Sequence, residues 1–499
     1  MFEIAELGQK LSKKEYDEQA PILRERLLEV QARLRTADFP VIVLFAGVDG
    51  AGKGETANRL NAWMDPRGIV TRAYGPPSEE EIEQPRYWRF WRQLPPRGRI
   101  GIFLSAWYSR PLLRRVYEET TDDHYERELN EILSFEQMLA ADGALILKFW
   151  MHLSHKAQRR RLKSLEQDPL SSWRVTKTDW KHWKKYDAFI SSAEKAISRT
   201  STALAPWRII EGADPRFRSI QVGTILLTGI ERQLEARAHG GLSGEGESVV
   251  EQPPGGRPGS VLAGLDLTRK LDKSDYKVQL RKYQGRLNRF QRKARARKLS
   301  TVVVFEGWDA AGKGGAIRRI VSALDARDLE IITIAAPTDE ERTHHYLWRF
   351  WRHLGRAGRF TIFDRSWYGR VLVERIEGFA GEQEWRRAYA EINDFERQLV
   401  EHGILLIKFW LHVTPEEQAR RFDARRQIPH KSWKLTEEDW RNREKRESYQ
   451  TAVNQMIGQT STALAPWILV EAEDKRFARI KVLRAICDAL ARALQGPSN

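Results

Sequence analysis

A short segment rich in glycine and ending in a lysine occurs twice in this chain, 260 residues apart, and it constrains the fold more than any other feature. The first copy reads GVDGAGKG from Gly47, and the second reads GWDAAGKG from Gly307. Each copy follows an apolar run and precedes a segment with a helical pattern. A strand, a Gly-x4-Gly-Lys loop and a helix together form a P-loop, in which backbone N–H groups, the helix N-terminus and the lysine hold phosphate. We therefore expect a protein that handles phosphorylated ligands.

The same offset of 260 relates most of the two halves to each other. The strings WRFWR and TSTALAPW, for example, each occur once per half. A repeat of this length indicates a duplicated domain rather than a solenoid unit. A run rich in Gly, Pro and Ser separates the halves and is typical of a linker. The sequence thus predicts an N-terminal domain over residues 1–237, a linker over 238–260 and a C-terminal domain over 261–499.

Within each repeat, short apolar segments alternate with helical patterns, and a basic helical segment (22–35 and 278–297) comes first. The expected strands lie near 41–46, 70–74, 100–104, 144–149 and 208–211, and near 301–305, 330–335, 360–364, 404–409 and 468–471. Continuous apolar strands alternating with helices indicate a parallel sheet covered on both faces. The predicted fold class is α/β, with two P-loop domains in tandem. In such sheets ligands bind at the carboxyl ends of the strands, where the motifs fall.

The charge balance favours an anionic partner. The chain has 84 Lys and Arg against 68 Asp and Glu, a net charge of +16. Charge alone leaves nucleic acid, an anionic membrane and phosphate-rich small molecules open. No apolar run approaches the roughly 18 residues that span a bilayer, and the N-terminus lacks the layout of a signal peptide. We therefore expect a cytoplasmic protein with no membrane partner.

The second P-loop has an unusual residue after its lysine, and this points to a metal site built from carboxylates. Gly314 stands where P-loops usually carry the Ser or Thr that binds Mg²⁺. Asp309 lies inside the loop, and Asp364 ends the apolar strand near 360–364. Mg²⁺ commonly uses one or two carboxylates together with substrate phosphates, so this pair suffices. The structural alternatives are a turn-capping role for Asp309 and a helix N-cap for Asp364.

Basic residues follow two of the strands. Arg365 comes directly after Asp364, and Arg370 lies a few residues further on. Arginines at a strand end beside a phosphate loop can stabilise charge on a phosphoryl group in transfer, and a surface salt bridge is the alternative. A second cluster follows the fourth strand and contains Arg420, Arg421, Arg425, Arg426, Lys431 and Lys434. Since Arg421 and Arg425 share a helix face, the cluster indicates a helical lid over phosphates, with a solvated basic face as the alternative.

These motifs together resemble the polyphosphate kinase 2 family. The matching strings are GWDAAGKG at 307–314, FDRSWY at 363–368, KSWK at 431–434, EIN with FE at 391–396, and TST with APW at 460–467. The resemblance covers nearly the whole chain, once per repeat, and the two-domain form is similar to the fused polyphosphate:AMP phosphotransferase branch. It implies a thymidylate-kinase-like core with a helical lid. It also implies Mg²⁺-dependent transfer of a terminal phosphate from inorganic polyphosphate to AMP, giving ADP.

The resemblance also implies roles for individual residues. Asp309 and Asp364 would hold Mg²⁺, Arg365 would contact phosphate at the reaction centre, and Arg421 and Arg425 would be lid arginines. The residues expected to bind phosphate are Gly307, Gly312, Lys313, Gly314, Arg370, Lys431 and Lys434. The positive net charge of the chain suits a long polyanion as the phosphate donor.

The first repeat lacks part of this set. At the offset of 260, Leu104 replaces Asp364, Ser105 replaces Arg365 and Leu165 replaces Arg425. Its P-loop keeps Asp49 and Lys53. Because leucine cannot coordinate Mg²⁺, we predict that the N-terminal domain is inactive, although it keeps the elements that bind phosphate.

Two kinds of alternative remain at this point. A kinase with the same loop could use ATP as donor, or could use polyphosphate to phosphorylate ADP or GDP. A nucleic-acid-binding protein is compatible with the charge, but no helix-turn-helix, zinc or RNA-binding signature stands out, so we expect no nucleic acid. The apparent duplication suggests that like domains pack together, and we expect a homo-oligomer.

Overall fold

The computed structural model describes residues 1–239, 261–427 and 444–495, and the chain divides into two compact units. Unit 1 comprises Met1–Pro77, Phe90–Ser248 and Asp339–His345; unit 2 comprises Ser78–Arg89, Val249–Thr338 and Tyr346–Asn499. The predicted linker lies mostly outside the described residues, so the predicted domain borders stay a prediction. Among the residues described, none of the helices combines the length and apolarity that a membrane crossing requires.

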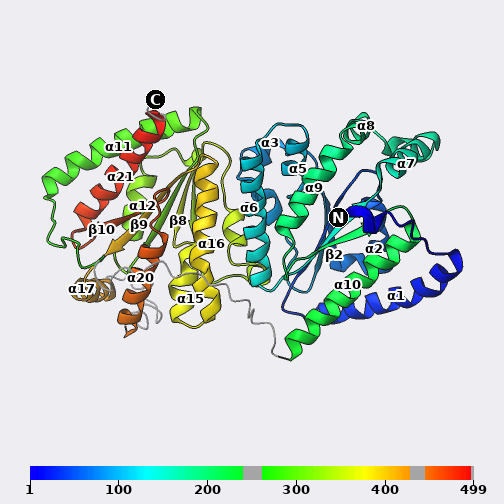
Figure 1. The fold of residues 1–499 in the computed structure, drawn as a ribbon. Coiled ribbons are helices and arrows are strands. Elements are labelled where there is room, and N and C mark those ends of the chain that lie inside the picture. The colour runs from blue at the N-terminus through cyan, green and yellow to red at the C-terminus, as the bar shows by residue number, and fades with distance from the viewer. Residues whose placement is uncertain (240–260, 428–443, 496–499) are drawn as a thin grey trace. The chain divides into compact units, whose positions relative to one another are not determined.

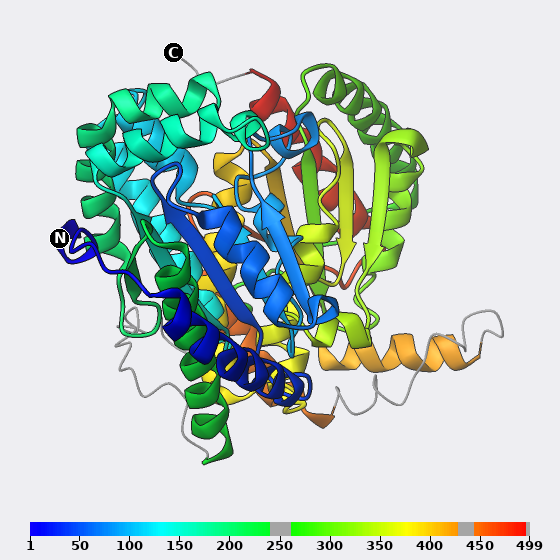
Figure 2. The ribbon, with the colours of Figure 1, turned by 90° about the vertical axis from the view of Figure 1, so that its right-hand side faces the viewer.

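Unit 1 is built on a five-stranded parallel sheet in the order β2-β3-β1-β4-β5. Its strands are β1 (Val41–Gly47), β2 (Ile69–Ala73), β3 (Ile100–Leu104), β4 (Leu145–His152) and β5 (Trp207–Glu211). One face is covered by α1 (Lys13–Leu34), α2 (Lys53–Trp63) and α10 (Pro215–Ala238), and the other by α5 (Ser109–Val116), α6 (Asp122–Ala141) and α9 (Tyr186–Thr200). Helices α1 and α10 run side by side in both views (Figures 1 and 2).

Unit 2 repeats this topology, with the strand order β7-β8-β6-β9-β10 and parallel pairing throughout. Its strands are β6 (Thr301–Gly307), β7 (Leu329–Thr333), β8 (Phe360–Asp364), β9 (Leu405–His412) and β10 (Trp467–Glu471). One face carries α11 (Lys273–Ala296), α12 (Lys313–Val321) and α21 (Lys475–Gln495); the other carries α15 (Val373–Ile376), α16 (Glu382–Glu401) and α20 (Arg446–Thr460) (Figure 1). In the described parts of both units, the remaining α-helices are α3 (Glu79–Ile82), α4 (Trp88–Trp91), α7 (His155–Gln167), α8 (Lys177–Lys184), α13 (Asp339–Arg342), α14 (Trp348–Arg352) and α17 (Pro415–Arg426).

The predicted α/β fold class is confirmed, and all ten expected strands form within a few residues of their predicted limits. The helix that opens the first repeat begins earlier than expected, at Lys13 rather than residue 22. Its start is fixed by a capping box, in which the side chains of Ser12 and Glu15 each accept a hydrogen bond from the other's backbone N–H. A capping box satisfies two of the backbone donors that a helix start leaves unpaired, so the helix extends to it.

A buried ion pair with its hydrogen-bond partners joins the layers of unit 2. The Lys408 ammonium donates to Glu396 at 2.6 Å, to the Tyr368 hydroxyl at 2.9 Å and to the Thr460 carbonyl at 2.8 Å. The Tyr368 hydroxyl and the Trp367 indole N–H donate to the other oxygen of Glu396, at 2.6 and 3.0 Å. Burial lowers the pKa of Lys408 and raises the pKa of Glu396, and the ion pair opposes both shifts. We call these five residues the lysine network.

The lysine network ties three elements to the segment that follows β8. Lys408 lies on β9, Glu396 on α16 and Thr460 at the end of α20, whereas Trp367 and Tyr368 come just after β8. Unit 1 has the same network at the matching positions, formed by Lys148, Glu136, Thr200, Trp107 and Tyr108. Because each group in it is paired, the network holds the end of β8 in one position.

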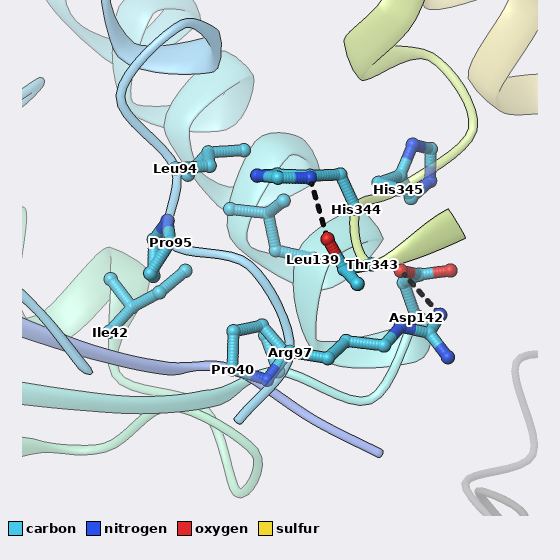
Figure 3. A pocket seen from close by; sticks show the side chains of 11 residues that line it. Pro40, Ile42, Leu94, Pro95, Arg97, Leu139, Asp142, Thr343, His344 and His345 are labelled. Carbon is cyan, nitrogen blue, oxygen red and sulfur yellow. Dashed lines mark hydrogen bonds and ion pairs between the residues drawn. The ribbon is translucent and has the colours of Figure 1, made fainter. Parts of the chain in front are cut away.

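A small pocket in unit 1 has lining residues that do not match a substrate site (Figure 3). It encloses about 20 Å³, room for roughly one water molecule. Its wall is largely apolar, with Ile42, Leu94 and Leu139 among the lining residues, and Arg97 pairs with Asp142 at 3.4 Å beside them. A pocket of this size holds no nucleotide, so the site has to be sought at the P-loops.

Replacing Lys408 with Met should lower the free energy of unfolding of the protein by about 3–5 kcal/mol, because Glu396 is left buried without its cation. Urea unfolding followed by tryptophan fluorescence measures the change. The Lys408→Met/Glu396→Gln double variant is the matched control and should lose clearly less stability. An unchanged urea midpoint for Lys408→Met would show that the pair contributes nothing.

Candidate active site

The P-loop of unit 2 leaves the central strand β6 and leads into α12. Gly307 has φ 145°, and a Cβ there would lie 2.5 Å from the Leu411 carbonyl oxygen, so only glycine fits. Gly312 caps α12 with φ 112°, which is again the left-handed region. The Lys313 ammonium donates to the Gly307 carbonyl at 2.6 Å and lies within 3.4 Å of the Trp308 carbonyl. The structure therefore places the lysine against its own loop, at the N-terminus of a helix that favours an anion.

The segment after β8 brings the predicted acidic and basic residues to this loop. Asp364 ends β8 beside Phe305 of β6. The backbone N–H of Arg365 donates to the Phe305 carbonyl at 3.1 Å, with the residue at φ 65°. Its guanidinium lies 3.3 Å from a carboxylate oxygen of Asp309. The cap of the following 3-10 helix, η5 (Trp367–Val371), is Ser366 rather than Asp364, so Asp364 does not have the capping role that we considered.

Asp309 and Asp364 have the donor chemistry that Mg²⁺ requires. Their side chains offer carboxylate oxygens, which are hard ligands. Within the described ranges, no group of three His, Cys, Asp or Glu residues is arranged to hold a metal ion. Two carboxylates suit Mg²⁺, since this ion keeps several water molecules and binds substrate phosphates as well.

A buried carboxylate beside the loop, Glu306, was missed by the sequence reasoning. Its side chain is 6% exposed, and it accepts a hydrogen bond from the Ser366 hydroxyl at 2.8 Å. Burial raises the pKa of Glu306 to about 7, although Lys313, Ser366 and Arg365 favour its ionised form. The Glu306–Ser366 bond ties the last part of β6 to the segment that carries Asp364 and Arg365.

A signal for Glu306 was present in the comparison of the two repeats. Ala46 stands at the matching position in the first repeat, and Ala106 replaces Ser366. Both partners of the hydrogen bond are thus missing from the repeat that also lacks Asp364 and Arg365. Residues that differ together between the repeats mark the site better than the shared motifs do.

Arg421 has a different place from the one expected for a lid arginine. Its side chain is 4% exposed, and all five of its N–H donors are directed at protein acceptors. These acceptors are the Glu417 carboxylate and the backbone carbonyls of Ala310, Ala311, Ala472 and Glu473. Arg421 therefore braces the P-loop against the end of β10, and in this conformation it has no donor left for a phosphate.

The other expected basic residues are placed as follows. Arg370 pairs with Glu374 at 3.2 Å and stacks over the Tyr346 ring at 4.5 Å, so its guanidinium is engaged there. Arg425 lies on α17, half-buried, and makes no hydrogen bond or ion pair with the residues described. Lys431 and Lys434 lie outside the described residues. A phosphate-binding role for these residues stays a prediction.

The first P-loop has the same backbone path but different side chains around it. Leu104 ends β3 and Ser105 follows it, and Ser105 keeps the left-handed backbone of its counterpart at φ 54°. Asp49 accepts from His182 at 2.6 Å and lies 3.5 Å from the Lys53 ammonium. Burial opposes the ionisation of Asp49, but Lys53 and His182 lower its pKa to about 2. The aspartate is thus engaged within the protein, and no second carboxylate corresponds to Asp364.

Comparison with known proteins agrees with this architecture. The chain belongs to the Polyphosphate kinase 2 (PPK2) family, which it matches over residues 10–238 and 270–496. It is 51% identical to a polyphosphate:AMP phosphotransferase of Pseudomonas aeruginosa, over 99% of each chain. It is 41% identical to an ADP-polyphosphate phosphotransferase of Rhizobium meliloti, over 43% of this chain and 70% of the relative. A crystal structure of a polyphosphate kinase 2 from P. aeruginosa superposes with a TM-score of 0.89, at 49% identity over the full length of both chains.

Exchanging Glu306 for Gln should alter how stability depends on pH. Folding raises the pKa of Glu306 from 4.5 to about 7, so the native state holds this proton more tightly, and stability falls as pH rises through that window. Between pH 5 and pH 7.5 the wild-type protein should lose about 2 kcal/mol relative to Glu306→Gln. Urea unfolding of both metal-free proteins at several pH values measures this. Parallel pH profiles would contradict the assignment.

Proposed function

We propose that this chain transfers the terminal phosphate of inorganic polyphosphate to AMP, giving ADP, at the P-loop of unit 2. The observation that carries the proposal is the junction of β8 with the loop, where Arg365, next to Asp364, lies 3.3 Å from Asp309. A phosphate bound by the loop would therefore lie close to both the acidic and the basic candidates. The choice of donor and acceptor is supported by the polyphosphate:AMP phosphotransferase of P. aeruginosa, which is 51% identical over the full length.

The residues act by positioning substrates and balancing charge, as phosphoryl transfer requires. The loop amides and the N-terminus of α12 hold the phosphate in transit, and Lys313 turns from its loop carbonyls to that phosphate. Arg365 stabilises the charge that builds up on the transferring group. Arg421 and Glu306 act through other groups: Arg421 fixes the loop backbone, and Glu306 fixes the segment after β8. No covalent intermediate on the protein is needed.

Asp309 and Asp364 hold Mg²⁺ in this proposal. When bound, the ion neutralises negative charge on the phosphates. With one of these two carboxylates replaced by leucine, unit 1 has no equivalent site, and we infer that it performs no transfer. A cytoplasmic location and a homo-oligomeric state also remain our predictions.

A second candidate reaction has ADP rather than AMP as the acceptor. The relative named ADP-polyphosphate phosphotransferase matches 43% of this chain, about one repeat, and thus favours this reading for a single domain. The AMP acceptor is preferred because the relative with that name matches both repeats. The described residues offer no base-specific pair that would separate the acceptors.

The first experiment is chromatography of AMP incubated with the purified protein, Mg²⁺ and long-chain polyphosphate. ADP should form, and should not form when polyphosphate is omitted. ATP in place of polyphosphate should support little transfer. If ATP is the better donor, the proposed reaction is wrong. If ADP is consumed and AMP is not, the second candidate replaces it.

Variants of the two P-loops should separate the two units. Lys313→Ala and Asp364→Asn should each lower turnover by about 100- to 1000-fold, the range for loss of one electrostatic group at a reaction centre. Lys53→Ala is the matched control and should leave turnover within about twofold of the wild type. Turnover that survives Lys313→Ala but is lost in Lys53→Ala would move the site to unit 1.

A further inference from the structure

The first P-loop carries a glutamate that the second lacks. Glu55 is the third residue of α2, and at the same position of α12 the second repeat has Gly315. Three arginines converge on the Glu55 carboxylate: Arg161 at 2.7 Å, Arg174 at 3.1 Å, and Arg218 in direct contact with its other oxygen. One carboxylate thus receives hydrogen bonds from three guanidinium groups at the start of the helix after the loop.

Two of these arginines lie directly against the glycines of the loop. A Cβ on Gly52 would come within 2.3 Å of the Arg218 guanidinium carbon, and a Cβ on Gly50 would lie 3.4 Å from the Arg161 stem. The Arg218 side chain is 2% exposed, and its Nε–H has no acceptor among the described residues. A buried donor left over in this way shows that Glu55 does not satisfy the cluster fully.

The matching region of unit 2 has no carboxylate at the position of Glu55, and its basic groups differ, because Ala478 stands where unit 1 has Arg218. A Cβ on Gly315 would lie 3.3 Å from the Arg479 guanidinium, and Arg479 makes no hydrogen bond or ion pair with the residues described. Arg421, the counterpart of Arg161, reaches the loop carbonyls instead. Near the second loop, the Arg479 side chain thus has no carboxylate partner among the described residues, whereas the three guanidinium groups near the first loop already pair with Glu55.

A carboxylate surrounded by guanidinium groups at a helix N-terminus has the charge and the oxygen acceptors of a bound phosphate. Because Glu55 belongs to the chain, it competes with any phosphate in solution at a high effective concentration. We propose that Glu55 occupies the first phosphate loop as an internal substitute for phosphate, so that unit 1 does not bind polyphosphate. This inference goes beyond the proposed function, because it concerns binding rather than the missing metal ligand.

The test is titration calorimetry with tripolyphosphate in a Lys313→Ala background, which weakens the second loop. Adding Glu55→Gly should create a saturable site whose affinity exceeds that of the Glu55 parent by at least about tenfold. Adding Lys53→Ala as well should remove it, which assigns the site to the first loop. Glu55→Gln keeps the size of the side chain without its charge. Its affinity for tripolyphosphate should lie between those of the Glu55 parent and the Glu55→Gly variant. Circular dichroism shows that each variant is folded.

Two outcomes would overturn the inference. The first is a Lys53-dependent tripolyphosphate site already present in the Lys313→Ala parent. The second is a folded Glu55→Gly variant that binds no more tightly than that parent. The reciprocal change, Gly315→Glu in the wild-type chain, should weaken tripolyphosphate binding by at least about tenfold, and unchanged binding would count against the inference. Failure of the proposed reaction is seen separately, in the AMP assay of the wild-type protein.

Discussion

In each unit, a buried contact between a lysine on the fourth strand and a glutamate on a facing helix fixes the segment that follows the third strand. An unpaired ammonium or carboxylate at this depth would cost several kcal/mol, so the groups around Lys408 must all be present together. Those groups come from β9, α16, α20 and the segment after β8. Since that segment begins with Arg365, directly after Asp364 at the end of β8, the network fixes the position of the catalytic candidates from outside the proposed site. Part of the FDRSWY motif is therefore explained by structure alone. Its Trp and Tyr belong to the lysine network, whereas its Arg contacts Asp309 of the loop.

Comparison of the two units separates the residues that support the fold from the residues proposed to act on phosphate. Unit 1 retains the lysine network in full, with Lys148 and Glu136 2.6 Å apart as in unit 2. It has lost the groups that face the loop, and it has gained Glu55 among three arginines. The scaffold is therefore preserved where the chemistry is not. An intact network beside missing catalytic candidates is not the pattern expected of a unit whose role is to perform the reaction. Its retained core is consistent with a structural contribution to the whole protein.

The fold was predictable from the sequence because its signals are local. Apolar runs, glycine loops and helical patterns repeat at a constant offset, and each is read from neighbouring residues. That Asp364 would lie beside the end of β6 was also predictable, since the carboxyl ends of parallel strands meet at one edge of the sheet. The place of Arg421 was not predictable. An arginine on a basic helix face looks the same in sequence whether it points to a ligand or to five acceptors from the loop, from its own helix and from the end of β10. Glu306 was missed because a lone carboxylate at the end of a buried strand carries little signal, and only the joint replacement of Glu306 and Ser366 by alanine in the first repeat points to it.

The loss of function that we infer for unit 1 is spread over several contacts, and this bears on whether one substitution could reverse it. The changes Leu104→Asp and Ser105→Arg would supply the metal ligand and the phosphate contact. They would not supply the hydrogen bond that holds this segment in unit 2. In unit 2 the segment after β8 is tied to β6 by the bond from Ser366 to Glu306, and the matching residues Ala106 and Ala46 can form no such bond. Glu55 would still pair with the arginines around the loop. The new carboxylate would therefore face a site that is less ordered and already neutralised. Groups that act as a unit contribute non-additively. Activity in unit 1 would therefore require the Glu306–Ser366 type of hydrogen bond and the removal of Glu55, in addition to the Asp and Arg.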